Sequence, residues 1–153
     1  MSNIDEIIAL LDWNREPSDQ EKGIILARDV ECIKAFFQPC GKNYGKNVWD
    51  NCAVIICERS DQELNYYIDD MLFWIKDLNW PGSKLIQQRL VRFREVDMLA
   101  IYINSFVPKL HKLEMSDWLI FIAPLLDNAL LVKKLKPETL EILRESRKGN
   151  GFA

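Results

Sequence analysis

The sequence predicts an all-α protein built as a short stack of antiparallel helical hairpins. Its 153 residues fit one domain, residues 1–153, with a core large enough to fold unaided. Alternating apolar and polar residues flanked by turn residues, the pattern of a half-buried strand, are missing throughout. Two halves of the chain also resemble each other. Finally, one segment spaces its apolar residues along a single helical stripe: Leu64, Ile68, Met71, Leu72, Ile75 and Leu78.

The first hairpin is expected to occupy residues 1–38. Ser2 or Asn3 can cap its first helix, because both side chains accept hydrogen bonds from the free N–H groups of a first helical turn. Ser18 or Asp19 can cap its second helix in the same way. These capping residues set the two expected helix starts.

The central hairpins are expected over residues 47–113, after a loop at 38–46 that contains one proline and two glycines. Asp61 is expected to cap the longest of their helices, since acidic residues are favourable in a first turn. Aromatic residues form a second apolar stripe on this helix, so it should be covered on both sides. The expected helices span residues 47–59, 61–78, 80–93 and 96–113.

The C-terminal part, residues 116–147, is expected to form a pair of helices that meet at Pro137. Pro108 and Pro124 lie inside otherwise helical patterns. Because proline lacks a backbone donor and clashes with the preceding turn, each predicts a kink or a helix end. The last residues, 148–153, predict a frayed tail.

An internal repeat connects the two halves of the chain. Residues 4–8 match residues 68–72 in character, and Pro17 meets Pro81 at the same offset. Each half then enters a second amphipathic helix. A hairpin that cannot bury both faces alone is stabilised by stacking on a similar hairpin, which predicts a short α-solenoid, or superhelix, of the HEAT type. Helices resemble one another easily, so chance similarity is the alternative.

Two corners of this stack place a tryptophan and an asparagine shortly before a proline. At the second corner, Asn79 is expected to cap the next helix, Pro81 to occupy its first turn and Trp80 to cover the joint. If both corners lie on one edge, their side chains suit a protein partner. Aromatic residues at helical spacing usually belong to the core, so a structural role is the alternative. The candidate partner-binding residues are Trp13, Arg15, Glu16, Asn79 and Trp80.

Residues typical of catalytic or metal sites are sparse. His111 is the only histidine, and its position between lysines near a helix end favours exposure to solvent. The four cysteines include no C-x-x-C pair and do not make a familiar zinc set. Neither a dinucleotide-binding nor a P-loop glycine motif occurs. We therefore expect no catalytic residue, no metal and no cofactor, and we do not expect an enzyme.

Charge and hydropathy narrow the expected partners. The net charge of -3 has the wrong sign for a protein that binds by neutralising phosphates, so nucleic acid is not an expected partner. The uncharged run of residues 118–126 is about half of what a membrane-spanning helix requires. The first residues lack the features of a secretory signal, which predicts a cytoplasmic protein with free thiols. A basic C-terminal end and an acidic central region could pair subunits, so a homo-oligomer is possible.

A small-molecule binder or enzyme is the alternative function. It would use an apolar cleft lined by Tyr66, Tyr67, Trp74 and Trp80, with His111 or a cysteine supplying polarity. A third possibility is a nucleic-acid module that uses the basic C-terminal end, which a salt-dependent binding assay would test.

Residues 73–82, FWIKDLNWPG, resemble the tryptophan-rich signature of a bacterial family, the domain of unknown function numbered 5071. Segments 20–24 and 47–53 are similar to parts of its longer members. The resemblance implies a HEAT-like helical protein and carries no established activity, so it transfers no functional residue. A looser resemblance to small acidic proteins of toxin-immunity neighbourhoods suggests an immunity-like role. We therefore expect a non-catalytic helical-repeat module that binds another protein, as an immunity-like or regulatory protein.

Overall fold

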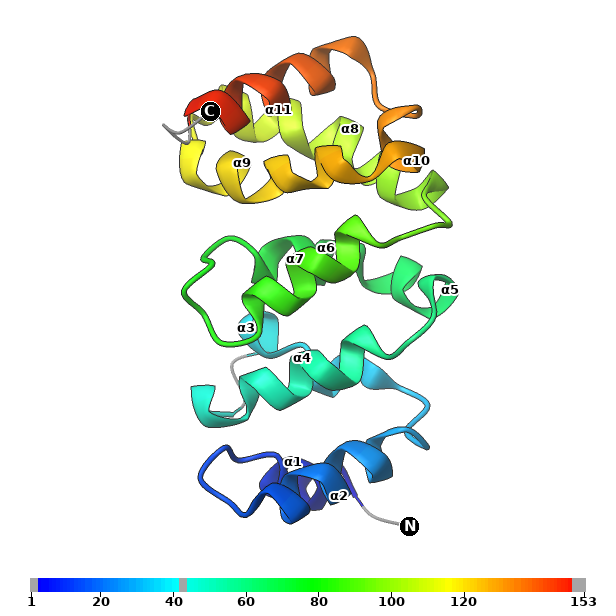
Figure 1. Cartoon of the computed structure of the whole chain (residues 1–153), viewed down its shortest axis with the longest axis vertical. Helices are drawn as coiled ribbons and strands as arrows, with labels where there is room; N and C mark the ends of the chain where they lie inside the picture. Colours follow the sequence, from blue (N-terminus) through cyan, green and yellow to red (C-terminus); the bar gives the residue numbers. More distant parts are fainter. Residues whose placement is uncertain (1–2, 42–43, 150–153) are drawn as a thin grey trace.

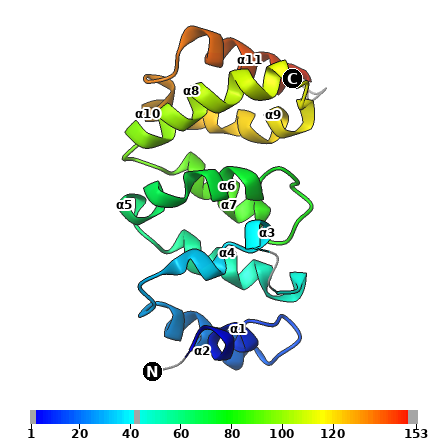
Figure 2. The ribbon, with the colours of Figure 1, turned by 180° about the vertical axis from the view of Figure 1, so that it is seen from behind.

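The computed structural model describes residues 3–41 and 44–149. In these two segments every regular element is an α-helix or a 3₁₀-helix, which confirms the predicted all-α class. Paired elements lie one above another along the long axis, from the N-terminal pair to the C-terminal group (Figures 1 and 2). We call each such group a layer. The chain passes through the layers in sequence order, so neighbouring layers are also neighbours along the chain.

The first layer is a hairpin of α1 (Ile4–Leu10) and α2 (Pro17–Ala27). The Asn3 side chain caps α1 by accepting a 2.8 Å hydrogen bond from a backbone N–H of the first turn, as predicted. The two helices approach closely at Gly23. A Cβ placed there would lie 2.7 Å from a terminal methyl of Leu11 and 3.0 Å from the Cβ of Leu10, so a larger residue would force these side chains to shift.

The second helix of this hairpin starts earlier than predicted. α2 begins at Pro17, and Glu16 precedes it without a side-chain hydrogen bond to the helix. The predicted caps Ser18 and Asp19 are therefore wrong. Pro17 explains the difference, because its fixed φ suits the first helical position and it has no N–H that needs a cap.

The second layer pairs short pieces with one longer helix. The stretch predicted as the loop 38–46 begins with a single helical turn, which tolerates Pro39 because the first N–H groups of a helix have no partner within it. The loop prediction is wrong for these residues, and residues 42–43 lie outside the described part of the chain. The elements are η1 (Ile33–Phe36), α3 (Gln38–Gly41), η2 (Lys46–Val48) and α4 (Trp49–Cys57).

The helix predicted over residues 61–78 is broken into consecutive pieces in the third layer. Ser60 caps the first piece by accepting a 3.2 Å hydrogen bond from a backbone N–H, so the predicted cap Asp61 is wrong. Tyr67 leaves helical geometry, with φ of -126° and ψ of 20°, and its ring stacks on Phe37 with centroids 4.9 Å apart. The elements are α5 (Asp61–Leu64), η3 (Asn65–Tyr67), α6 (Ile68–Trp74) and α7 (Ser83–Val91).

The remaining helices close the C-terminal end. The first of these helices, α8 (Asp97–Lys112), continues for a turn beyond Pro108, so the prediction of a helix end at Pro108 is wrong. α-Helical geometry does end just before Pro124, as predicted. The last helix reaches Gly149, which includes the first two residues of the predicted frayed tail, and residues 150–153 of that tail lie outside the described residues. The elements are α8 (Asp97–Lys112), α9 (Ser116–Ile122), η4 (Ala123–Asp127), α10 (Ala129–Val132) and α11 (Pro137–Gly149).

A recurring polar contact joins each layer to the one before it. The guanidinium of Arg59 donates to the carbonyls of Ala27 and Val30 at the end of α2, both at 2.8 Å. The guanidinium of Arg89 donates to the carbonyls of Cys57, at 3.2 Å, and Arg59, at 2.8 Å, just beyond α4. Each arginine thereby donates to carbonyls at and just beyond a helix end, where the regular helical hydrogen bonds stop.

The same contact recurs once more and reveals the period of the stack. The Asn128 amide donates to the carbonyl of Phe93 at 2.9 Å, beyond the end of α7. Arg59 and Arg89 each reach back 32 residues to the helix before. The two arginines are themselves 30 residues apart, and the offset of 64 residues between 4–8 and 68–72 is close to twice that period, so the repeat seen in the sequence relates helices two layers apart.

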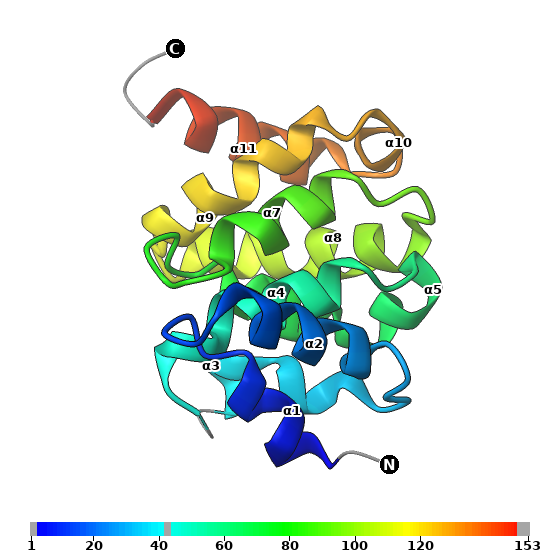
Figure 3. The ribbon, with the colours of Figure 1, turned by 60° about the horizontal axis from the view of Figure 1, so that its bottom comes forward.

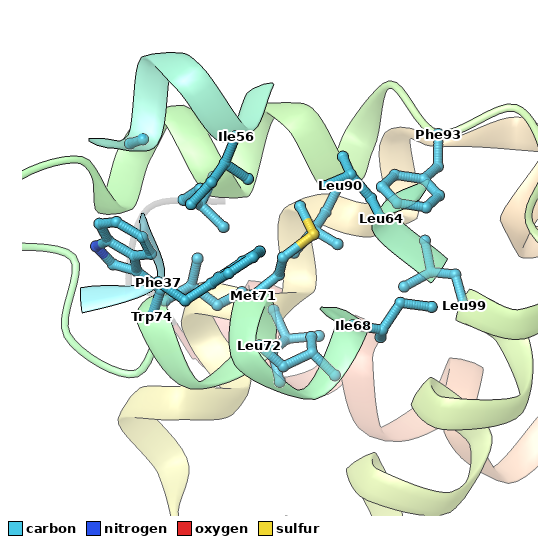
Figure 4. Close-up of a cluster of buried hydrophobic side chains, with 14 of the residues drawn as sticks. Phe37, Ile56, Leu64, Ile68, Met71, Leu72, Trp74, Leu90, Phe93 and Leu99 are labelled. Atoms are coloured by element: carbon cyan, nitrogen blue, oxygen red, sulfur yellow. The ribbon is translucent and has the colours of Figure 1, made fainter. Parts of the chain in front are cut away.

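One cluster of buried apolar side chains runs through the layers. Figure 4 shows Ile56 of α4, Leu64 of α5, Met71 of α6 and Leu90 of α7 lying together. The predicted apolar stripe of residues 64–78 is buried at every position except its last, Leu78, which is half-buried. The stripe is therefore correct even though the helix that carries it is interrupted.

Candidate functional site

The turns along one side of the stack form the candidate functional site. They comprise residues 11–16, 44–48, 75–82 and 113–117, and they lie on the left of Figure 1 and on the right of Figure 2, which is seen from behind. Figure 3 shows the same arrangement with the N-terminal end brought forward. We call this surface the corner edge. It brings the corner of Trp13 and the corner of Trp80 to the same side.

Trp80 closes the joint between α6 and α7. Its ring centroid lies 5.9 Å from that of Phe73 and 6.0 Å from that of Trp49. The side chain is half-buried and packs against the core. Because tilted and edge-to-face ring contacts stabilise beyond simple burial, Trp80 has the packing role that the sequence left as an alternative. Only part of its ring is open to a partner.

The predicted roles of Asn79 and Pro81 at this corner are wrong. α7 begins at Ser83, and Gly82 precedes it with a left-handed φ of 81°. Asn79 is exposed, and its backbone N–H donates to the Asp77 carboxylate at 2.9 Å. Glycine adopts a left-handed conformation at little cost, so Gly82 starts the helix without a side-chain cap.

Trp13 is the exposed aromatic residue of the corner edge, with 47% of its surface accessible. Its backbone N–H donates to the carbonyl of Asn47 at 3.0 Å, which ties the first turn to the second layer. Arg15 pairs with Asp19 at 3.4 Å, and Glu16 is exposed without a side-chain bond to the helix it precedes. The candidates around the first corner therefore all lie at the surface.

Hydrogen bonds within residues 11–16 give this turn a defined shape. The backbone N–H of Asn14 donates to the Asp12 carboxylate at 2.9 Å. That bond, together with one from the side chain of Asn47, holds the pKa of Asp12 below its ordinary value. The Gln20 side chain donates to the carbonyl of Arg15 at 2.8 Å. The turn is therefore held from both of its ends.

A row of aromatic rings continues from Trp80 toward the C-terminal layer. The Phe73 and Trp118 centroids are 6.2 Å apart, and those of Trp118 and Phe106 are 4.9 Å apart. The Lys76 ammonium lies 5.6 Å from the Phe73 ring and 5.2 Å from the Trp118 ring. A cation over a ring face is attracted by the ring's negative quadrupole. The sequence analysis missed this row, although a tryptophan near each corner was the signal that could have revealed it.

A hollow of about 340 Å³ opens beside Lys76 at the last turn of the corner edge. Glu114 in this turn has a left-handed φ of 57°, which costs a non-glycine residue about 1 kcal/mol. The volume is at the low end for a ligand pocket, so it suits one side chain of a partner better than a substrate. The lining residues are Lys76, Glu114, Met115, Ser116, Asp117 and Trp118.

The residues proposed for an apolar cleft do not gather around one. Trp74 has no exposed surface, and its indole N–H donates to the carbonyl of Pro81 at 3.0 Å, inside the joint. Tyr66 is 86% exposed, whereas Tyr67 stacks on Phe37. Since these side chains point into the core, into solvent and against another ring, they do not form a common wall.

Three of the four thiols have a raised pKa, and the fourth, Cys32, is exposed. Burial raises the pKa of Cys52 to about 12 and that of Cys57 to about 11, so both stay protonated near neutral pH. Burial, with a hydrogen bond to Asp70, raises the pKa of Cys40 to about 12. His111 is exposed in the last turn of α8. Within residues 3–41 and 44–149, no group of three or more His, Cys, Asp and Glu side chains is placed to hold a metal ion.

Residues 45–150 match the family described as Domain of unknown function (DUF5071). The chain belongs to this family. The matched residues contain the tryptophan-rich segment 73–82 and every helix from α4 onward. The first hairpin, which includes residues 20–24, precedes the matched residues. No curated protein and no solved structure matches the chain. Among the described residues of this DUF5071 protein, no helix combines the length and the apolar character needed to cross a membrane.

Proposed function

We propose that this protein is a non-catalytic, HEAT-like helical-repeat module that binds another protein through the corner edge. In this proposal it acts in the bacterial cytoplasm as an immunity-like or regulatory protein. A stack of hairpins suits such a role, because it offers a long edge without requiring a catalytic centre.

The repeated contacts between layers support the HEAT-like arrangement. Arg59 and Arg89 hold equivalent helix ends at the same spacing, and Asn128 takes the corresponding place one layer later. Neighbouring layers are thereby joined at the carboxyl ends of α2, α4 and α7. This arrangement keeps the turns of the corner edge in a fixed register, which lowers the entropy lost when a partner binds.

The exposed indole of Trp13 is the observation that carries the proposal. Tryptophan is enriched among residues that dominate protein interfaces, and here 47% of one is accessible on a turn held by hydrogen bonds. Along the same edge Lys46 lies 5.8 Å from the Trp49 ring, and Lys76 lies over Phe73. Because the corner edge also carries acidic side chains, an apolar partner surface with charges of both signs would complement it.

The test is affinity capture from a lysate of the source organism, with bound proteins identified by mass spectrometry. Trp13→Ala should lose a partner that the wild-type protein retains, while its melting temperature stays unchanged. Tyr66→Ala is the matched control, because Tyr66 is 86% exposed but lies outside the corner edge. Retention of the same partner by Trp13→Ala, or its loss from both variants, would refute a role for this edge.

A further inference from the structure

The two ends of the stack differ in what they expose. At the C-terminal end, the outer face of α11 carries exposed charged residues, as expected for a helix that caps a repeat array. At the N-terminal end, Ile25 is 49% exposed, and further aliphatic side chains around it are only half-buried. These half-buried residues are Ile4, Ile24, Leu26 and Val30.

A groove of about 770 Å³ opens at this N-terminal end, which Figure 3 brings to the front. It lies between the start of α1 and the end of α2, and its walls are mainly aliphatic. The volume is within the range that holds several apolar side chains. The lining residues are Asn3, Ile4, Ile7, Leu26, Asp29, Val30 and Glu31.

The wall of the groove is held in place from the second layer. Arg59 donates to the carbonyls of Ala27 and Val30, and the Val30 N–H donates to the carbonyl of Ala27 at 3.0 Å. On the opposite wall, Asn3 caps α1. Because both walls are fixed by hydrogen bonds, the groove is formed before any ligand arrives.

The charges around the groove have one dominant sign. Of the seven residues that line it, the two charged ones are both acidic, and none of the three basic side chains of residues 1–32 lines it. Asp29 and Glu31 line the groove, and neither forms an ion pair within the described part of the chain. One of the bases, Arg28, is already paired with Glu58 at 3.1 Å. The groove is therefore apolar inside and acidic at its rim.

From these observations we infer that the N-terminal groove binds a basic amphipathic helix of a partner protein. Such a helix inserts apolar residues at i, i+3, i+4 and i+7 into the groove, while its lysines and arginines face Asp29 and Glu31. A second copy of this chain is a poorer occupant. Pairing of two grooves would bring the same acidic rim into contact with itself, and head-to-tail pairing would offer α11, whose outer face carries exposed charged rather than apolar residues. The inference rests on the proposed function, protein binding, and adds a second surface with a defined partner chemistry.

The test uses the full chain and a fluorescein-labelled helical peptide of about 14 residues, with leucines on one face and lysines elsewhere. Fluorescence anisotropy should show saturable binding. The charge-reversal variant Asp29→Lys/Glu31→Lys should weaken it about tenfold or more, and added salt should weaken it as well. Glu138→Lys/Glu141→Lys, at the opposite end of the stack, is the matched control and should bind like wild type.

Two comparison peptides and one spectrum complete the test. The peptide with glutamate in place of lysine, and the one with glutamine in place of leucine, should both bind at least tenfold more weakly. Amide chemical shifts should move mainly at residues 3–7 and 26–31. Equal binding by the glutamate peptide, no effect of reversing Asp29 and Glu31, or shifts spread along the corner edge would overturn the inference. So would a dimer, seen by light scattering, that dissociates when these acids are reversed.

The two proposals fail separately. Trp13→Ala lies at the other end of α2 and should bind the lysine peptide normally even though it loses the corner-edge partner. If the groove fails but Trp13→Ala still loses its partner, protein binding through the corner edge stands.

Discussion

Replacing Arg89 with methionine is expected to destabilise the fold by about 3–5 kcal/mol. Arg89 is only 8% exposed. Its guanidinium donates to the carbonyls of Cys57 and Arg59, at 3.2 and 2.8 Å, and to the Asp61 carboxylate at 2.6 Å. These contacts join the end of α4 to α7. Methionine keeps most of the apolar stem and removes every donor, so the change isolates the polar contacts.

The size of the effect follows from what each partner loses. A hydrogen bond to a charged group contributes about 1.5–3 kcal/mol, and the Cys57 and Arg59 carbonyls would lose this donor in a nearly dry site. Asp61 keeps two donors, the backbone N–H groups of Arg94 and Glu95, at 2.7 and 3.1 Å. Because this carboxylate is not left without partners, we expect a value in the lower half of the range.

Urea unfolding followed by circular dichroism measures this loss. Arg28→Met is the matched control, because the Arg28–Glu58 pair is solvent-exposed on its arginine side, at 58%, and should contribute much less than the buried clamp. In thermal melts Arg89→Met should lower the midpoint by roughly 6–20 °C. A loss below about 1 kcal/mol, or one equal to that of Arg28→Met, would show that the buried clamp does not join the layers as argued.

Three further predictions concern pH, the tryptophans and the thiols. Burial alone would raise the pKa of Asp61, but hydrogen bonds from Arg94, Glu95 and Arg89 lower it from the ordinary value of 3.8. The ionised carboxylate therefore stabilises the fold fully above pH 3.8, and this stabilisation is lost as the pH falls through the lowered pKa. The difference in unfolding free energy between wild type and Asp61→Asn should therefore shrink in acid, and a constant difference would contradict this. Trp80→Ala should lower the unfolding free energy by about 2 kcal/mol, roughly half of the loss for a fully buried tryptophan. Trp13→Ala should lower it by less than about 0.5 kcal/mol. Equal losses of the two variants in urea melts would be inconsistent with the different burial of the two side chains. At mildly alkaline pH an aromatic disulfide reagent should modify the exposed Cys32 rapidly and Cys52 only on unfolding, which mass spectrometry of the native protein checks.

Parts of the fold could be predicted because they depend on residues close together in the chain. The apolar stripe of residues 64–78 needed only helical spacing, and the Asn3 cap needed only a side chain beside its own helix start. The cap at Asp61 was wrong for a long-range reason: its carboxylate binds Arg89 and the turn at residues 94–95. A local rule cannot anticipate such a competitor.

The candidate site shows the same limit. The sequence pointed to tryptophans at the corners, and both corners do lie on one edge (Figures 1 and 2). It could not separate Trp80, which packs between two rings, from Trp13, which is exposed. Both residues stand beside similar neighbours in the chain, and their environments differ because Phe73 of α6 and Trp49 of α4 pack against Trp80.

The sequence by itself determined the helical class, the main apolar stripe and the tendency of similar hairpins to stack, because periodicity and helix-end chemistry act over a few residues. Only the tertiary structure decided that Arg59, Arg89 and Asn128 join successive layers, and that an acidic groove stays open at the N-terminal end. These features depend on which helix end meets which side chain about 30 residues away, and on which side chains of α1 and α2 come together to line the groove. Hydrogen bonding and burial depend on contacts between residues that are far apart in the chain, and the local spacing of residues does not specify those contacts.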